Sequence, residues 1–91
     1  MSSRLLIPAQ LRSLAGGAAQ IECDGTTLGA VLDDLARRWP VLERRLRDER
    51  GQLRPHVLIF VDSAGVRGAG ELGTPVHDGS EVFVAPAVSG G

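Results

Sequence analysis

One segment of this chain has clear helical periodicity, and it limits what the remaining residues can form. Its apolar side chains recur at the spacing of one helix face: Leu28, Val31, Leu32 and Leu35. Thr26 or Thr27 can cap its start, and Pro40 ends it, because the residue before a proline is pushed out of the right-handed helical region. A second, shorter helical stretch is expected over residues 41–50. The other apolar segments must therefore build a layer that covers one principal helix.

Four short runs with β character surround this helix. They lie at residues 4–7, 19–23, 57–61 and 81–85. The first two predict a hairpin whose wide loop contains Gly16-Gly17 and room for a helical turn at residues 10–15. The third is apolar throughout, which predicts a central strand, whereas glycine-rich residues 66–74 predict a loop with a short edge strand around Val66-Arg67. Together they predict the α+β class, one sheet packed on one main helix.

Length and composition restrict the functions that the chain can serve. With 91 residues, 43% hydrophobic and 23% charged, we expect a single folded domain over residues 1–91 with no room for a deep catalytic pocket. The net charge of -1 argues against nucleic acid and anionic membranes as partners. No stretch approaches the roughly 20 apolar residues that span a bilayer, and the first residues lack a secretory signal. We therefore expect a cytoplasmic protein.

Charged residues between positions 33 and 50 are mixed in sign, which we interpret as a solvated helical surface. The arginines are Arg37, Arg38, Arg44, Arg45, Arg47 and Arg50, and the acids are Asp33, Asp34, Glu43, Asp48 and Glu49. Asp33 and Asp34 are neighbours on a helix and point in different directions, so they do not predict a shared acid–base site. His56 and His77 lack a second imidazole at metal-binding spacing. We expect neither a metal site nor a cofactor bound by the chain itself.

Cys23 is the single cysteine, so no disulfide can form within the chain. As a nucleophile it would need a thiol pKa lowered by a cation or a helix N-terminus. A buried or half-buried strand cysteine is the interpretation that we favour. The glycines of residues 65–73 lack the strand, spacing and lysine of a phosphate-binding loop.

The end of the chain is the remaining candidate for chemistry. It consists of Pro86, Ala87, Val88, Ser89, Gly90 and Gly91, directly after the last expected strand. Glycine has no β-carbon, so a Gly-Gly end fits a narrow channel, and Pro86 keeps the tail from continuing the sheet. Two terminal glycines in an arbitrary protein would carry no function, so their meaning depends on the rest of the chain.

This ending and the order of elements resemble the MoaD/ThiS family of sulfur carriers over nearly the whole chain. Several short motifs are most similar to CysO-type carriers of cysteine biosynthesis: Ile7-Pro8, Leu11-Arg12, Gly16-Gly17, Thr27-Leu28-Gly29-Ala30-Val31, Val66-Arg67, Asp78-Gly79 and Pro86-Ala87-Val88-Ser89-Gly90-Gly91. Two features depart from the family pattern, namely Val61-Asp62, where many carriers have Val-Asn, and the loop at residues 68–73. The resemblance implies the ubiquitin-like β-grasp fold, with a mixed sheet packed on one main helix.

The resemblance also implies a mechanism in which the chain is a co-substrate and not an enzyme. An E1-like adenylating enzyme of the MoeB/ThiF type would use MgATP to adenylate the Gly91 carboxylate, with residues 86–90 threading into its active site. Sulfide or a persulfide would then displace AMP and leave a thiocarboxylate. In CysO-type systems this group would attack an aminoacrylate on a cysteine synthase that depends on pyridoxal phosphate, and a metalloprotease would release cysteine from the tail.

A docking surface for these partners is expected on the sheet face that the helix leaves open. Alternation along the last two strong strands separates two sets of side chains. By analogy with the family, Ile59, Val61, Val82 and Val84 face the helix, and Leu58, Phe60, Phe83 and Ala85 form an exposed apolar patch. The alternative is that Phe60 and Phe83 both belong to the core.

Other functions stay open from the sequence. The sulfur could serve molybdopterin, thiamine or a sulfur-containing natural product instead of cysteine. The chain could also be a ubiquitin-like interaction module without chemistry at its end, or a thiol enzyme that uses Cys23.

Overall fold

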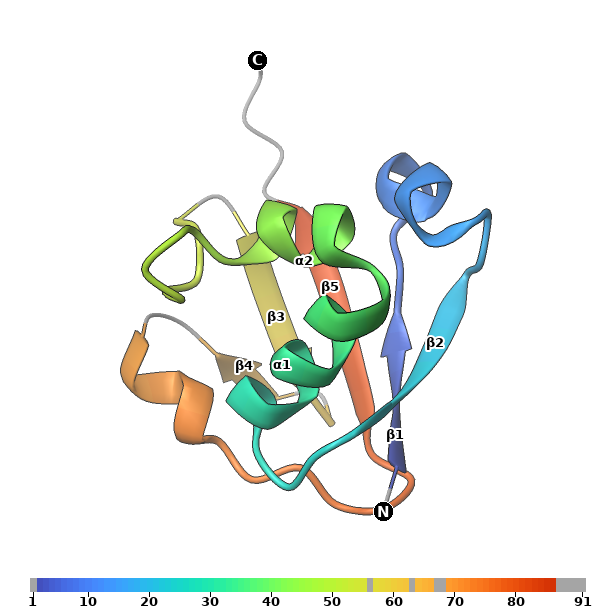
Figure 1. Cartoon of the computed structure of the whole chain (residues 1–91). Helices are drawn as coiled ribbons and strands as arrows, with labels where there is room; N and C mark the ends of the chain where they lie inside the picture. Colours follow the sequence, from blue (N-terminus) through green and yellow to red (C-terminus); the bar gives the residue numbers. More distant parts are fainter. Residues whose placement is uncertain (1, 56, 63, 67–68, 87–91) are drawn as a thin grey trace.

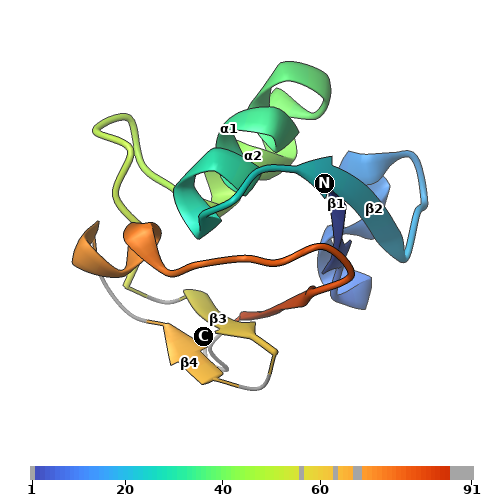
Figure 2. The same ribbon diagram turned by 90° about the horizontal axis from the view of Figure 1, so that it is seen from below.

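Where the structure describes the chain, it forms a five-stranded mixed sheet with both α-helices on one side (Figures 1 and 2). The structure, a computed structural model, describes residues 2–55, 57–62, 64–66 and 69–86. Its elements are β1 Ser2–Leu6, η1 Ala9–Ala15 (a 3-10 helix), β2 Gln20–Asp24, α1 Leu28–Arg38, α2 Pro40–Leu46, β3 Val57–Val61, β4 Ala64–Val66, η2 Ala69–Gly73 (3-10) and β5 Glu81–Pro86. No helix in the described parts is long and apolar enough to cross a membrane. The α+β prediction is confirmed.

The strand order is β2-β1-β5-β3-β4, which places the last strand of the chain at the centre of the sheet. β5 pairs parallel to β1 and antiparallel to β3. The predicted hairpin of β1 and β2 is present, and the predicted helical turn in its loop is η1. β3 matches its predicted bounds but lies between β5 and β4 and not at the centre. The predicted edge strand is β4, which includes Val66, and Arg67 lies outside the described residues.

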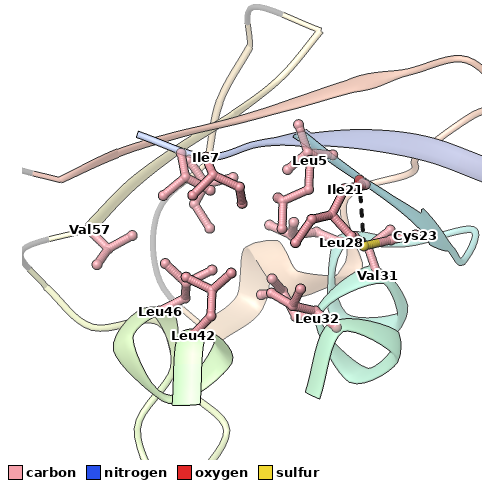
Figure 3. Packing of buried hydrophobic residues seen from close by; sticks show 14 of the residues in the cluster. Leu5, Ile7, Ile21, Cys23, Leu28, Val31, Leu32, Leu42, Leu46 and Val57 are labelled. Carbon is pink, nitrogen blue, oxygen red and sulfur yellow. Dashed lines mark hydrogen bonds between the residues drawn. The ribbon is translucent and has the colours of Figure 1, made fainter. Parts of the chain in front are cut away.

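α1 supplies the helical half of the core. Thr27 is its N-cap, and the Thr27 hydroxyl accepts a hydrogen bond from the Ala30 amide at 3.2 Å. Figure 3 shows the apolar face of α1 and the side chains of α2 directed at the sheet. The largest fully buried side chains belong to all of these layers: Leu5, Leu28, Leu32, Leu35, Leu42, Leu46 and Ile59.

α2 begins at Pro40 and ends at Leu46, four residues before the predicted end near residue 50. The helix stops because Asp48 offers the backbone an alternative set of hydrogen bonds. One Asp48 carboxylate oxygen accepts from the amides of Arg50 and Gln52, at 2.9 and 3.0 Å. The resulting turn sends the chain back, and the Arg54 amide donates to the Leu46 carbonyl.

Gly25, in the turn between β2 and α1, is required for two separate reasons. Its φ is +150°, a conformation that L side chains rarely adopt, and a β-carbon there would lie 2.7 Å from the Val31 amide nitrogen. We predict that Gly25→Ala lowers the free energy of unfolding by about 2–4 kcal/mol, because backbone strain and overpacking add. Urea denaturation would measure the change.

Gly51 is the matched control, since its φ is +80° but nothing lies within 4 Å of the position that a β-carbon would take. Gly51→Ala should lose only about 1–2 kcal/mol, the strain component alone. Equal losses in the two variants would show that the close approach of Gly25 to α1 contributes nothing.

Candidate functional site

The candidate site begins where β5 ends, since the predicted tail residues follow β5 in the sequence. β5 was expected to stop at Ala85, but Pro86 is its last residue and pairs in register with Val57. Proline lacks an N–H group, so it is tolerated at the end of a ladder and donates nothing to extend it. Residues 87–91, including the predicted reactive Gly91 and the predicted tail residues Ala87, Val88, Ser89 and Gly90, lie outside the described residues. The structure therefore defines the base of the tail.

The two faces of the sheet beside this base have different environments. On the helix side Val57, Ile59, Val61, Val82 and Val84 are all buried. On the other side Leu58, Phe60 and Ala85 are partly exposed, and Phe83 is 51% exposed. The division of side chains between the faces that alternation predicted is therefore correct. The alternative of two core phenylalanines is wrong.

Leu6 belongs to this open face and was missed in the sequence reasoning. It is the register partner of Phe83 on β1, and Phe60 is the register partner of Phe83 on β3. The three side chains therefore form a row across the sheet. The available signal was the alternation in β1, where Leu5 is fully buried and Leu6 is partly exposed. We call Leu6, Leu58, Phe60, Phe83 and Ala85 the open-face patch.

Phe83 stands between two hollows in the open-face patch. The hollow on the β1 side has a volume of about 370 Å³, and its lining includes Leu6, Pro8, Arg12 and Ala85. The hollow on the β3 side has a volume of about 340 Å³, and its lining includes Phe60, Asp62 and Glu81. A projecting aromatic ring with apolar depressions beside it is the geometry of an anchor for a partner protein.

Asp62 forms the end of this face that is farther from the tail, and it explains one departure from the family pattern. Its φ is +49°, a left-handed conformation that Asn and Asp tolerate better than other residues. Its carboxylate accepts from the Glu81 amide at 2.9 Å and from the Ser80 hydroxyl at 2.7 Å. These hydrogen bonds, the first of them above all, hold the pKa of Asp62 below its usual value. Aspartate is therefore compatible with the left-handed conformation that this position requires.

The described residues contain no alternative catalytic group of the kinds considered. Cys23 is 1% exposed, and burial raises the pKa of its thiol to about 11, so it is protonated at neutral pH and a poor nucleophile. The favoured interpretation of a buried strand cysteine is confirmed. His77 is exposed on a loop, and His56 lies outside the described residues. No group of three or more histidine, cysteine or acidic side chains that could hold a metal occurs in the part of the chain that is described.

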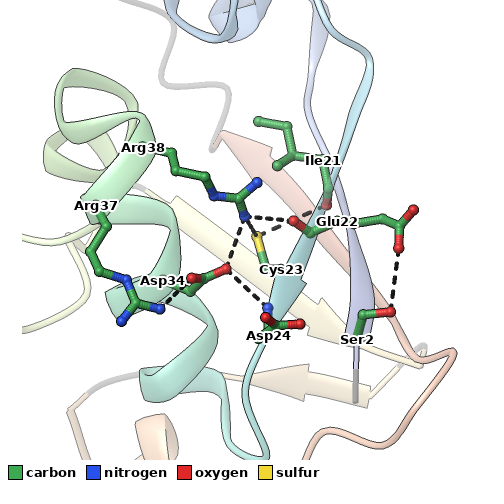
Figure 4. A network of polar contacts seen from close by, with 8 residues as sticks. All are labelled: Ser2, Ile21, Glu22, Cys23, Asp24, Asp34, Arg37 and Arg38. Carbon is green, nitrogen blue, oxygen red and sulfur yellow. Dashed lines mark hydrogen bonds and ion pairs between the residues drawn. The ribbon is translucent and has the colours of Figure 1, made fainter.

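The solvated-surface interpretation of the charged helices is wrong for Asp34, Glu43 and Arg47, which are 8%, 9% and 9% exposed. The Asp34 carboxylate pairs with Arg37 and Arg38 and accepts from the Asp24 amide, so it joins α1 to β2 (Figure 4). Asp34 is buried because α1 packs against β2 at this point, and helical periodicity in the sequence does not reveal that contact. Asp33 points elsewhere, as predicted, and pairs with Arg47 on α2 at 2.8 Å.

The Asp34 network generates a pH dependence of stability. The hydrogen bond from Arg37 is the largest cause that lowers the pKa of Asp34, to about 2 from an ordinary 3.8. Its stabilising contribution is present above the ordinary pKa and is lost as pH falls through the folded-state pKa. We predict that unfolding free energy falls more steeply between about pH 4 and pH 2 in the wild type than in Asp34→Asn.

Chemical denaturation at a series of pH values would measure both slopes. Asp48 and Asp62 also have lowered pKa values. Both residues are present in the wild type and in the variant, so their contributions cancel when the two unfolding free energies are subtracted. Parallel curves would contradict the lowered pKa of Asp34.

The sheet order, the helix packed on one face and the tail that continues from the central strand define a ubiquitin-like β-grasp protein. The model of the ThiS family matches residues 5–91. The sulfur carrier protein CysO of Mycobacterium tuberculosis is 39% identical, with all of both chains covered. Its crystal structure superimposes with a TM-score of 0.85, covering 94% of this chain and 99% of that one.

Two further relatives extend this result. A chain of the BexX/CysO complex of Amycolatopsis orientalis has a TM-score of 0.87 and 32% identity, covering 98% of this chain and 99% of its own. Small archaeal modifier protein 1 of Haloferax volcanii is 33% identical over 91% of this chain and 93% of its own. The chain belongs to the ThiS family. CysO is a sulfur carrier protein, in agreement with the resemblance noted from the sequence.

Proposed function

We propose that this protein is a sulfur carrier whose Gly91 carboxylate is adenylated by an E1-like enzyme with MgATP and then converted to a thiocarboxylate. The observation that carries the proposal is the family match, which extends to the terminal residue itself, Gly91. The position of β5 supports it, because the central strand leads directly into the tail and is bordered by an apolar surface. We expect the carrier to act in the cytoplasm, where MgATP is available.

The proposed chemistry follows from the weakness of a carboxylate as an electrophile. Adenylation joins a carboxylate oxygen to the α-phosphorus of ATP and releases pyrophosphate. The sulfur of sulfide or of a persulfide then attacks the Gly91 carbonyl carbon, and the bond to the AMP oxygen breaks. A persulfide donor needs a further reductive cleavage of its S–S bond by a thiol. The chain's own Cys23 is buried and protonated, so the sulfur comes from outside the carrier.

The acceptor that we propose for the sulfur is an aminoacrylate held on a cysteine synthase that depends on pyridoxal phosphate. The full-length similarity to CysO supports this choice over molybdopterin or thiamine synthesis. A thiocarboxylate is a soft nucleophile that is ionised at neutral pH, and it suits addition to an activated alkene. A metalloprotease would then release cysteine from the tail.

We further propose that the open-face patch is the surface on which these partners dock. CysO of Amycolatopsis orientalis forms a complex with BexX, so a close structural relative binds a protein partner. In this chain Phe83 lies three residues before Pro86, which couples docking on the patch to the position of the tail. Rigid attachment of the tail to the docking strand would reduce the entropy cost of aligning Gly91 with ATP.

A second candidate is attachment of the activated end to other proteins. The similarity to small archaeal modifier protein 1 favours it. The same adenylate would be attacked by an amine in place of sulfide, so the two functions share the activation step and differ in the product.

Mass spectrometry of the intact protein would test the leading proposal. After incubation with its E1-like enzyme, MgATP and sulfide, the mass should rise by about 16 units, the difference between a sulfur and an oxygen atom. A variant with one alanine added after Gly91 should remain unchanged. A wild-type mass that stays constant with a verified activating enzyme would exclude the carrier function and favour the interaction module.

Phe83→Ala would test the docking surface. We predict that it raises the KM of the carrier in the adenylation reaction by about tenfold, because it removes an exposed aromatic anchor, with kcat unchanged. Val41→Ala is the matched control, since Val41 on α2 is the other large hydrophobic residue exposed in the described structure, at 58% against 51% for Phe83. A KM that changes equally in both variants would place the interface elsewhere.

A further inference from the structure

β2 is an edge strand, and edge strands are templates for unwanted pairing. Among the strands of the described residues it has β1 as its one neighbour, with which it pairs over five residues from Gln20 to Asp24. Its outer side therefore presents backbone donors and acceptors to any chain that can add a strand. Natural sheets protect such edges by covering or blocking them.

Two side chains of α1 occupy backbone groups on this edge (Figure 4). Arg38 Nη2 donates to the Glu22 carbonyl oxygen at 2.6 Å, and Asp34 Oδ2 accepts from the Asp24 amide at 3.0 Å. The two side chains also bind each other at 2.9 Å. Neither bond is a normal ladder contact, because both are made by a helix to strand groups that face away from β1. A strand that added to this edge would need the Glu22 carbonyl as an acceptor and the Asp24 amide as a donor.

We propose that Asp34 and Arg38 are an edge guard that keeps a second copy of this chain from adding its β2 to the sheet. Two β2 strands running antiparallel about Glu22 would match donors to acceptors and place Gln20 opposite Asp24. The product would be one continuous sheet across two molecules. Glu22 would face Glu22 of the other copy, so charge repulsion is a second barrier that salt screens. This guard is independent of the proposed sulfur chemistry.

The guard also explains why Asp34 is buried while its helical neighbour Asp33 is exposed. Arg37 holds the other oxygen of the Asp34 carboxylate, and it touches no backbone group of β2 among the contacts of the described residues. Arg37 therefore stabilises the ion pair without closing the edge. Arg37→Ala is therefore a control that removes one cation paired with the same carboxylate and leaves both backbone contacts of the guard in place.

The test compares the wild type with Asp34→Ala/Arg38→Ala and with Arg37→Ala. Sedimentation equilibrium in about 0.5 M NaCl would report mass, since this salt screens the facing glutamates. Hydrogen exchange would report the Asp24 amide. We expect the double variant to move from 9.6 kDa towards twice that mass as concentration rises. At concentrations where it is still monomeric, its Asp24 amide should exchange about tenfold faster or more, and dimerisation should protect that amide again. The wild type and Arg37→Ala should stay monomeric and protected.

Two single variants keep the test decisive if the double variant unfolds. Arg38→Ala leaves Asp34 paired with Arg37 and should dimerise more weakly. Asp34→Asn keeps an oxygen that can accept from the Asp24 amide, so it should retain protection and remain a monomer. A folded double or Arg38→Ala variant that stays monomeric at every concentration would overturn the proposal, as would dimerisation of Arg37→Ala to the same extent.

Discussion

The parallel pairing of β1 with β5 is the contact on which the rest of this structure depends. It joins the start of the chain to its end, with Leu5 in register with Val82 and both side chains fully buried. Such a non-local contact costs loop-closure entropy, which the burial of the apolar face against α1 offsets. Its consequence for the proposed function is that it fixes the position of β5, the strand that precedes the tail. The strand that carries the tail is held between two neighbours, and an edge strand would be held by one.

The sheet that this pairing completes has two faces with different environments. On the helix side the core consists of aliphatic side chains from β1, β2, β3, β5, α1 and α2. On the other side the open-face patch lies beside Pro86, and Phe83 projects from the central strand. A carrier that must present one end to successive enzymes needs a rigid body, an exposed docking face and a tail. The described residues form a packed body with an exposed apolar patch, which is the docking face that we propose.

The sequence predicted much of this arrangement because alternation and helical spacing are local properties. The strand at residues 57–61 follows from its unbroken apolar run, and α1 follows from its apolar spacing. A period of two separates Phe83 from Val82 and Val84. The failures concern properties that depend on neighbours in space. Asp34 is buried because its carboxylate accepts a hydrogen bond from the Asp24 amide of β2. α2 ends early because the Asp48 carboxylate accepts hydrogen bonds from the backbone amides of Arg50 and Gln52. Leu6 was overlooked because its membership of the patch requires the register of β1 against β5.

The central claim is that the reactive group is the carbonyl carbon of Gly91 and not a side chain of the folded body. The most direct measurement is NMR of the protein with an isotopic label at that carbon, followed during incubation with the activating enzyme, MgATP and sulfide. The account predicts that the carboxylate resonance is replaced by that of a thiocarboxylate, while the signals of Cys23 are unchanged. An unaltered Gly91 resonance in a reaction that transfers sulfur to the protein would contradict it.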